Sequence, residues 1–398
     1  MNAIYWIRFL TLVLVLMGFI TYYKIQIYNY FVDDYSIFKN VENDYIYLNR
    51  EPNQNFIKMN FLINKKHSFD SFIFGSSRVG KIHPGNIDNG NYYNMTYSEG
   101  LPSDHLENIK LLLKSKVEIK NIIIALDNFS FLVDPDSHLK QYLRLPHYLT
   151  DISEKNKLEF YLFYLNMKPN TRTQAQLTDF LISGDSRITY PYDFFETGMP
   201  TLLESETIRI ESNIQNHIAN KTFLNPSKNN VGKKHRIDET INEIGAISKL
   251  SKIHNFNLIV IINPVHMTTY LDANFIDFQK FKNKLSTVTN YYDFSGLNYI
   301  TVNNYFWHGT SHYRFKAGDI IKKIVFNYDN NDIPDDIGVF VTKNNINNHL
   351  KMLENQIKNK EQIIKAKVLA FEPNIHINCI PPNLPLGYAS LCGYIPKY

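Results

Sequence analysis

Two side chains that stand far apart in this sequence could together carry out acyl transfer. Ser77 follows an apolar run, Phe69–Phe74, in the segment Gly75-Ser76-Ser77-Arg78. His312 stands in the segment Ser311-His312-Tyr313, just before a predicted helix. A serine hydroxyl is a weak nucleophile at neutral pH and needs an adjacent base such as histidine. If the fold brings them together, Ser77 is the candidate nucleophile and His312 is its candidate general base.

Both residues also have a purely structural interpretation. Serine is a favoured turn and N-cap residue, so Ser77 could simply start a helix after its strand. His312 could in the same way cap the helix that is expected over about 316–326. Because Gly-x-Ser is a weak pattern by itself, the choice depends on the elements that would position these residues.

Strands and helices alternate along the middle of the chain. Continuous apolar runs of the kind found in parallel strands occur at Phe69–Phe74, Tyr92–Thr96, Asn121–Leu126, Leu258–Ile262 and Tyr291–Phe294. Helical spacing of apolar residues occurs between these runs and after the last of them. The alternation predicts an α/β fold with a three-layer parallel sheet. Ligands bind such sheets at the carboxyl ends of the strands, where Ser77 would stand.

The sequence divides into four regions. Residues 1–27 form a membrane anchor, 28–68 a juxtamembrane connector, and 69–328 the α/β domain. An insertion at about 131–235, with an aromatic loop at Tyr190–Pro200, is expected to cover an edge of the sheet. Residues 329–398 form a polar C-terminal helix and a Pro-rich tail. This tail contains the two cysteines of the chain, Cys379 and Cys392, which therefore cannot crosslink the domain.

The N-terminal segment predicts an uncleaved transmembrane helix. Phe9–Tyr23 contains no charged residue, and the apolar character continues on the N-terminal side of Arg8. The segment reaches the length of about twenty residues that a bilayer requires. A cleaved signal peptide is the alternative, but no small-x-small cleavage sequence follows the apolar run. Asp33 and Asp34 follow the segment, which favours an extracytoplasmic domain on a single-pass bacterial cell membrane.

Composition excludes several classes of protein. The 398 residues carry 42 basic and 38 acidic residues, and no basic block with interleaved aromatics, so nucleic acid is not an expected partner. A hydrophobic fraction of 44% is too high for a disordered chain. His308 and His312 have a spacing known from metal sites, but no cysteine or carboxylate cluster accompanies them. We therefore expect neither a metal nor a cofactor.

Four segments, taken in order, resemble the SGNH-type hydrolases. They are Phe74–Arg78, Asn94–Gly100 with the following Asp104-His105, Ala125–Ser130, and Tyr305–Trp307 with Ser311–Tyr313. The resemblance is closer to the membrane-anchored, acetyltransferase-like branch that acts on bacterial surface polysaccharides, relatives of the alginate acetylation and teichoic-acid D-alanyl transfer proteins. It covers about 69–326 and implies an SGNH- or flavodoxin-like sheet.

The resemblance also implies roles for individual residues. Ser77 would be the nucleophile and His312 the general base. The backbone N–H groups of Ser77 and Gly100, with the side chain of Asn128, would form the oxyanion hole. The implied activity is transfer or hydrolysis of an O-acyl group, most often O-acetyl, on a cell-surface polysaccharide through an acyl-serine intermediate. The implied partner is an integral-membrane O-acyltransferase that supplies the acyl group.

One position departs from the pattern of this family. The acid that orients the histidine usually stands three residues before it, where this chain has Gly309. Asp293 is the preferred substitute, Asp319 is a second, and a dyad without an acid is a third reading. The departure also leaves an alternative open: a catalytically degenerate, membrane-tethered protein that binds polysaccharide or acts as a scaffold.

Two further residues are candidates for substrate binding. Arg78 could contact an anionic group of the substrate, although an arginine in this position often pairs with a structural carboxylate. His308 lies close to His312 in the sequence and would face the same loop.

Overall fold

The structure is a computed structural model of the chain. It describes residues 3–33, 37–38, 52–85, 87–136, 143–144, 154–168, 196–199, 203–227, 235–327, 333–371, 375–377 and 394–396. Most of Tyr190–Pro200 and both cysteines, Cys379 and Cys392, lie outside the described residues.

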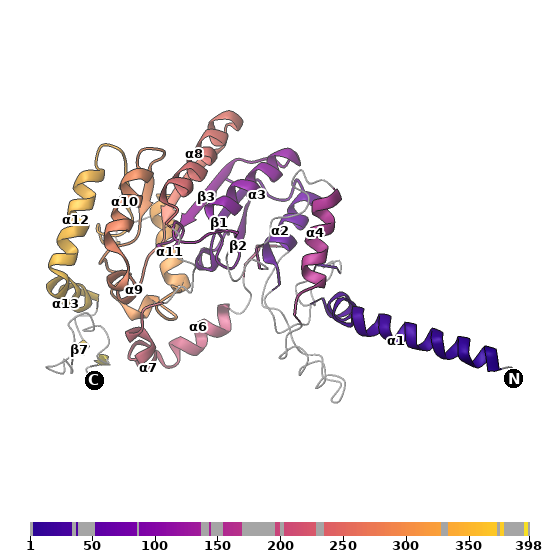
Figure 1. The fold of residues 1–398 in the computed structure, drawn as a ribbon. Helices are drawn as coiled ribbons and strands as arrows, with labels where there is room; N and C mark the ends of the chain where they lie inside the picture. Colours follow the sequence, from indigo (N-terminus) through magenta and orange to yellow (C-terminus); the bar gives the residue numbers. More distant parts are fainter. Residues whose placement is uncertain are drawn as a thin grey trace.

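A six-stranded sheet with the strand order β2-β1-β3-β4-β5-β6 forms the centre of the domain (Figure 1). The strands are β1 (Ser71–Gly75), β2 (Tyr92–Thr96), β3 (Asn121–Leu126), β4 (Asn257–Ile262), β5 (Tyr291–Asp293) and β6 (Val339–Val341). The first five run parallel to one another, and β6 pairs antiparallel with β5. The mixed α/β class and the five parallel strands agree with the sequence prediction. The antiparallel strand does not, and it extends the sheet past residue 328, where the sequence indicated an edge of the domain.

Helices surround this sheet. The α-helices are α1 (Ala3–Val32), α2 (Gln54–Asn64), α3 (Pro102–Lys114), α4 (Glu154–Leu165), α6 (Leu203–Glu211), α7 (Ile214–Ile218), α8 (Ile237–His254), α9 (Met267–Asp272), α10 (Phe275–Leu285), α11 (Phe315–Val325), α12 (Ile346–Lys358) and α13 (Lys360–Phe371). Short 3-10 helices are η1 (Ser77–Lys81), η3 (Lys221–Leu224) and η4 (Asn304–Phe306), and β7 (Ile375–Ile377) pairs with β8 (Tyr394–Pro396).

Alternate residues of the central strands pack against two different layers of side chains. Phe72 and Phe74 of β1 belong to a core that also contains residues of α3, α8 and α10. Ile73, between them, belongs to a second core with residues of η1 and α11. Successive side chains of a strand point to opposite faces, so both faces of this sheet are covered. This explains why the strands appear in the sequence as continuous apolar runs.

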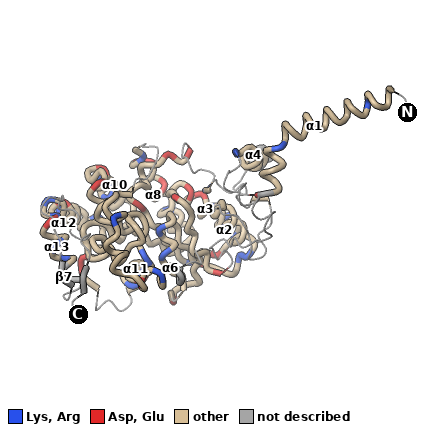
Figure 2. Tube along the Cα trace, turned by 90° about the horizontal axis from the view of Figure 1, so that it is seen from below, with Lys and Arg blue, Asp and Glu red and all other residues tan. Residues whose placement is uncertain are grey.

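Helix α1 projects from the domain, and its apolar side chains are exposed along its length (Figure 1). The span Ala3–Phe31 is long and apolar enough to cross a membrane. In Figure 2 its trace is almost free of charged residues. The segment expected to be a connector is partly built into the domain, because α2 buries Met59 and Leu62 in the core that contains Phe72.

The strand order places the topological switch point of the sheet between β1 and β3. The chain continues from β1 to β2 on one side, whereas β3 lies on the other side of β1. The loops that leave β1 and β3 therefore diverge at the carboxyl ends of these strands. Ligands of open α/β sheets bind at such a switch point. Ser77 follows β1 there, and Asp127 follows β3.

Candidate active site

Ser77 is the first residue of η1, immediately beyond the end of β1. The cap of this short helix is Ser76, whose Oγ accepts a hydrogen bond of 3.3 Å from the Arg78 amide. The structural role that serine could have in this turn is thus filled by Ser76. The Ser77 side chain remains half-exposed at the carboxyl edge of the sheet.

His312 lies in a tight loop that leads into α11. Trp307 and Tyr313 form an isolated antiparallel bridge across this loop, and the His308 amide donates to the His312 carbonyl over 2.9 Å. The N-cap residue of α11 is Arg314, so His312 does not cap the helix. Its Nε2 lies 2.8 Å from Ser77 Oγ, within hydrogen-bond distance. The structure therefore brings the two sequence-predicted residues together.

The second ring nitrogen of His312 contacts a hydroxyl group. Ser311 Oγ lies 2.6 Å from His312 Nδ1. If Nε2 accepts the proton of Ser77, Nδ1 carries the hydrogen and donates it to Ser311. This contact is compatible with the tautomer that a general base requires, although a hydroxyl, unlike the carboxylate of a Ser-His-Asp triad, can also donate to Nδ1. A neutral hydroxyl cannot supply the other role of that carboxylate, the stabilisation of the imidazolium by a negative charge.

Arg78 connects the loop that contains His312 to Asp127, the residue that follows β3. Its Nε donates to the Ser311 carbonyl over 2.7 Å, and its Nη1 donates to Asp127 Oδ1 over 2.7 Å. The Arg78 and Asp127 side chains are both buried. Arg78 thus has the structural carboxylate partner that the sequence left as an alternative to substrate binding.

Asp127 continues this network toward β4. Asn263 Nδ2 donates to Asp127 Oδ1 over 3.0 Å, and the Tyr313 hydroxyl donates to Asn263 Oδ1 over 3.1 Å. Burial, followed by the nearby charge of Asp127, raises the pKa of Tyr313, which keeps the phenol protonated as a donor. Sequence reasoning did not identify Asn263, Tyr313 or Ser311 as site residues. The one available signal was that Asp127 and Asn263 each follow the last residue of a parallel strand.

The sequence predicts three oxyanion donors: the amides of Ser77 and Gly100 and the side chain of Asn128. Within the described part of the chain, the amides of Ser77 and Gly100 donate no hydrogen bond. A Cβ atom on Gly100 would lie 2.8 Å from the Gly75 carbonyl oxygen, so the two loops approach as closely as a glycine permits. Asn128 Oδ1 accepts from Arg78 Nη1 over 3.1 Å, which leaves its NH₂ group to act as a donor. Donors of this kind stabilise the oxyanion of acyl transfer.

His308 is half-buried in the same loop as His312. Burial and the positive charges of Lys81 and Arg314 lower the pKa of His308 to about 3, so its ring is neutral near pH 7. Among the described residues, no group of three His, Cys, Asp or Glu side chains could hold a metal ion.

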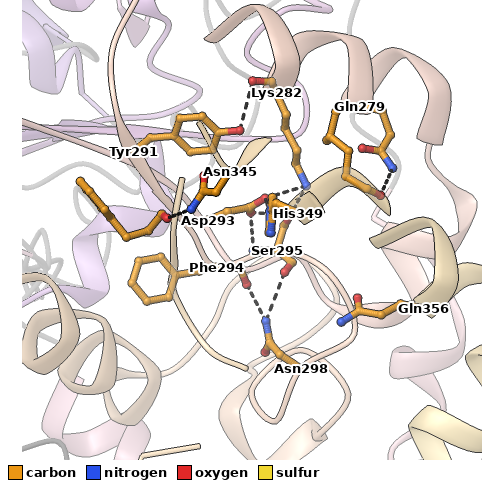
Figure 3. Close-up of polar contacts among 12 residues, drawn as sticks. Gln279, Lys282, Tyr291, Asp293, Phe294, Ser295, Asn298, Asn345, His349 and Gln356 are labelled. Atoms are coloured by element: carbon orange, nitrogen blue, oxygen red, sulfur yellow. Dashed lines mark hydrogen bonds and ion pairs between the residues drawn. The ribbon is translucent and has the colours of Figure 1, made fainter. Parts of the chain in front are cut away.

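The structure places Asp293 in a different cluster (Figure 3). Asp293 Oδ2 accepts a hydrogen bond from His349 Nε2 over 2.8 Å and lies 2.9 Å from Lys282 Nζ, while Oδ1 accepts from Ser295. The charge of Lys282 and the His349 bond outweigh burial and hold the Asp293 pKa below its ordinary value. The carboxylate connects β5 with α10 and α12. The assignment of Asp293 as the orienting acid is therefore corrected: Ser311 occupies the Nδ1 side of His312.

Asp319, the second residue that the sequence offered in place of the acid, also has a partner of its own. Asp319 lies on α11, where its carboxylate is 3.7 Å from Lys322 Nζ. Gly309, where the resemblance to SGNH-type hydrolases would place the acid, has open space around it, since no heavy atom beyond its chain neighbours lies within 4 Å of a Cβ placed there.

The chain matches no protein-family model, and no curated protein is significantly similar to it in sequence. The functional argument consequently depends on the geometry of the site.

Proposed function

We propose that this protein is a membrane-anchored, SGNH-like O-acyltransferase or esterase that works through an acyl-Ser77 intermediate. The observation that carries the proposal is the 2.8 Å contact between Ser77 Oγ and His312 Nε2. Its position at the switch point of the sheet supports the proposal, because ligands of α/β folds bind there.

The proposal implies a sequence of proton and acyl transfers. His312 Nε2 accepts the hydroxyl proton as Ser77 Oγ attacks the carbonyl carbon of the acyl donor. The Ser77 and Gly100 amides and the Asn128 NH₂ group donate to the oxygen that becomes negative. When the tetrahedral intermediate collapses, the alcohol of the donor leaves with the proton of His312. A sugar hydroxyl or water then gives its proton to His312 and attacks the acyl-serine ester, and His312 returns the proton to Ser77 Oγ as the ester bond to Ser77 breaks.

Among the described residues, the printed neighbour of His312 Nδ1 is the Ser311 hydroxyl, and a hydroxyl in this position predicts a slow enzyme. Ser311 orients the ring, but it supplies no negative charge to the imidazolium that forms in each half-reaction. Replacing the aspartate of a Ser-His-Asp triad lowers turnover by roughly four orders of magnitude. Turnover in this chain should accordingly lie well below that of a complete triad.

The substrate and the compartment follow from the resemblance and from α1. The acceptor would be a polysaccharide of the bacterial cell surface, and the acyl group would come from an integral-membrane O-acyltransferase. The span Ala3–Phe31 would hold the domain on the extracytoplasmic side of the cell membrane.

The Ser311 contact favours one alternative function. A domain with a hydroxyl in the place of the acid could bind polysaccharide, or serve as a scaffold, without performing acyl transfer. In that case Ser77 and His312 would contribute to ligand binding alone.

Turnover of an activated ester by the full chain in detergent distinguishes the two functions. We expect Ser77→Ala and His312→Ala each to lower the turnover of p-nitrophenyl acetate on the order of a hundredfold, and the double variant to be no slower than either, because the two residues act as a unit. Ser76→Ala is the matched control, since Ser76 caps η1 and does not contact His312. Equal turnover in the parent and in Ser77→Ala would contradict the enzyme and favour the alternative function, a protein that binds polysaccharide or acts as a scaffold.

A further inference from the structure

Over 158–165, helix α4 is apolar except for Glu159. Phe160 and Tyr164 point into the protein: the Phe160 ring stacks on Phe56 with centroids 5.2 Å apart, and the Tyr164 hydroxyl accepts from Asn53 over 2.7 Å. On the other sides, Leu158, Leu162 and Phe163 remain 58%, 40% and 37% exposed, respectively. A surface helix in water normally turns its apolar residues inward, so three large exposed apolar side chains on α4 call for a further contact.

Hydrogen bonds connect the C-terminal end of α4 to α1. Asn29 of α1 donates to the carbonyls of Leu165 and Met167 over 2.8 and 2.7 Å, and more weakly to that of Tyr164. Gln26 Nε2 donates to Asn166 Oδ1 over 3.0 Å. The last carbonyls of α4 are thus capped by side chains of α1, and the two helices keep a defined position relative to each other.

This connection places α4 at the level of the lipid headgroups if α1 spans a bilayer. The uncharged stretch of α1 ends at Lys24, and Asn29 follows about 7.5 Å further along the helix axis. The headgroup layer on each side of a bilayer is roughly 5–8 Å thick. Figure 1 shows α4 running across the line of α1 rather than along it, so a membrane-spanning α1 would hold α4 close to the plane of the membrane.

We propose that α4 is an interfacial helix, and that Leu158, Leu162 and Phe163 insert into the same lipid surface that α1 crosses. The occupant of these apolar side chains is lipid, because α4 is hydrogen-bonded to α1, whose own apolar side chains are exposed along the helix. Interfacial helices bury such side chains at the boundary between headgroups and acyl chains. The proposal does not depend on the chemistry of Ser77.

A series of buried contacts connects α4 to the carboxyl edge of the sheet. The Phe160–Phe56 stack connects α4 to α2, and Lys58 of α2 donates to the Asn94 carbonyl over 3.1 Å and to the Thr96 carbonyl over 2.5 Å. Thr96 Oγ1 in turn donates over 3.0 Å to the carbonyl of Ser76, which precedes Ser77. Helix α4 would therefore hold the site at a fixed height above the membrane.

A nitroxide side chain at position 162 tests this proposal in the full chain, reconstituted in vesicles of phosphatidylcholine and phosphatidylglycerol. Cys379→Ser and Cys392→Ser first remove the native thiols. Leu162→Cys, Leu14→Cys and Ile276→Cys then introduce one labelling site each. Ile276 is the matched control, an apolar residue on α10 that is 77% exposed. Collisions with oxygen, which partitions into lipid, and with a water-soluble nickel complex report the surroundings of each label.

We expect the label at 162 to collide more often with oxygen and severalfold less often with nickel than the label at 276, with position 14 deeper still. Equal nickel accessibility at 162 and 276 would show α4 in water and overturn the proposal. Low accessibility of 162 to both reagents would also overturn it, because protein would then cover α4. Frequent collisions of the label at 14 with nickel would show that α1 does not span the bilayer, and would also overturn the proposal. None of these outcomes alters ester turnover, so they leave the proposed function to its own test.

Discussion

Ser77 Oγ lies 2.8 Å from His312 Nε2, although 235 positions separate the two residues in the chain. Their neighbours maintain this distance, since Arg78 Nε donates to the Ser311 carbonyl over 2.7 Å. The residue after the candidate nucleophile is thus bonded to the residue before the candidate base. The buried Asp127 carboxylate completes the connection by accepting from the same guanidinium.

The Ser311 hydroxyl should have a modest effect on catalysis. Ser311→Ala removes the acceptor at His312 Nδ1, and a hydrogen bond between neutral groups contributes about 0.5–1.5 kcal/mol. We therefore expect kcat to fall about threefold to tenfold, with little change in KM and in the free energy of unfolding. Steady-state kinetics with an activated ester measures this. A loss as large as that of His312→Ala would mean that Ser311 takes part in the chemistry itself.

Placing an acid at position 309, where SGNH-type hydrolases carry one, should accelerate the proposed reaction. The space around Gly309 accepts a side chain without a clash. A carboxylate introduced by Gly309→Asp would stabilise the imidazolium, so we expect kcat to rise. Gly309→Asn is the matched control because it has the same shape without the charge. If both variants had the same kcat, the added carboxylate would have no influence on His312.

Gly100 should not tolerate a methyl group. The added Cβ of Gly100→Ala would lie 2.8 Å from the Gly75 carbonyl oxygen, so the loop must move and its amide must leave the oxyanion position. Loss of one oxyanion donor costs on the order of 3 kcal/mol of transition-state stabilisation, or about a hundredfold in kcat. Gly245→Ala in α8, where a Cβ has ordinary contacts, is the control with unchanged kcat. Full activity of Gly100→Ala would remove Gly100 from the oxyanion hole.

Asp293 should support stability rather than turnover. Asp293→Asn leaves Lys282 buried without a carboxylate 2.9 Å away, and breaking a buried ion pair costs about 3–5 kcal/mol. Urea unfolding should show this loss, whereas kcat per folded molecule should remain unchanged. The opposite result, normal stability with greatly reduced kcat, would show that Asp293 acts in catalysis.

Two buried histidines predict that the protein loses stability in mild acid. Burial lowers the pKa of His105 to about 3 and that of His266 to about 4, from 6.5. Below pH 6.5 the unfolded chain binds protons that the folded chain does not bind. The stabilisation is therefore complete above pH 6.5 and is lost as the pH falls toward these folded pKa values.

Each histidine should contribute a slope of about 1.4 kcal/mol per pH unit to the free energy of unfolding in this window. His266 illustrates the cause, because its Nδ1 accepts from the Thr268 amide and its Nε2 lies 2.9 Å from Asn304 Oδ1, which suits the neutral ring. Urea unfolding at pH 7, 6 and 5 measures the slope, and His266→Gln should reduce it. An unchanged slope in this variant would contradict the assignment to His266.

The sheet could be predicted from sequence because its central strands are buried on both faces. Asn121–Leu126 and the run ending at Ile262 are apolar at nearly every position, a pattern that few other structures produce. Val339–Val341 escaped prediction because three residues at an edge of the sheet, in a polar neighbourhood, carry no such signal.

The site could be predicted only in part. Ser77 and His312 are chemically distinctive residues at the ends of elements, which allowed them to be paired. Asp293 also ends a strand, but its partner His349 lies 56 positions further on, and nothing in the sequence shows that contact. Ser311 could not be foreseen, because a serine before a histidine is common and its bond to Nδ1 depends on how the loop closes.

Mass spectrometry of the full chain after mixing with an activated acetyl ester tests the central claim most directly. The account predicts a single acetyl group on the peptide that contains Ser77, formed rapidly by the parent, slowly by His312→Ala and not at all by Ser77→Ala. A folded parent protein that acquires no acetyl group on Ser77, or acquires it equally fast without His312, would contradict the account.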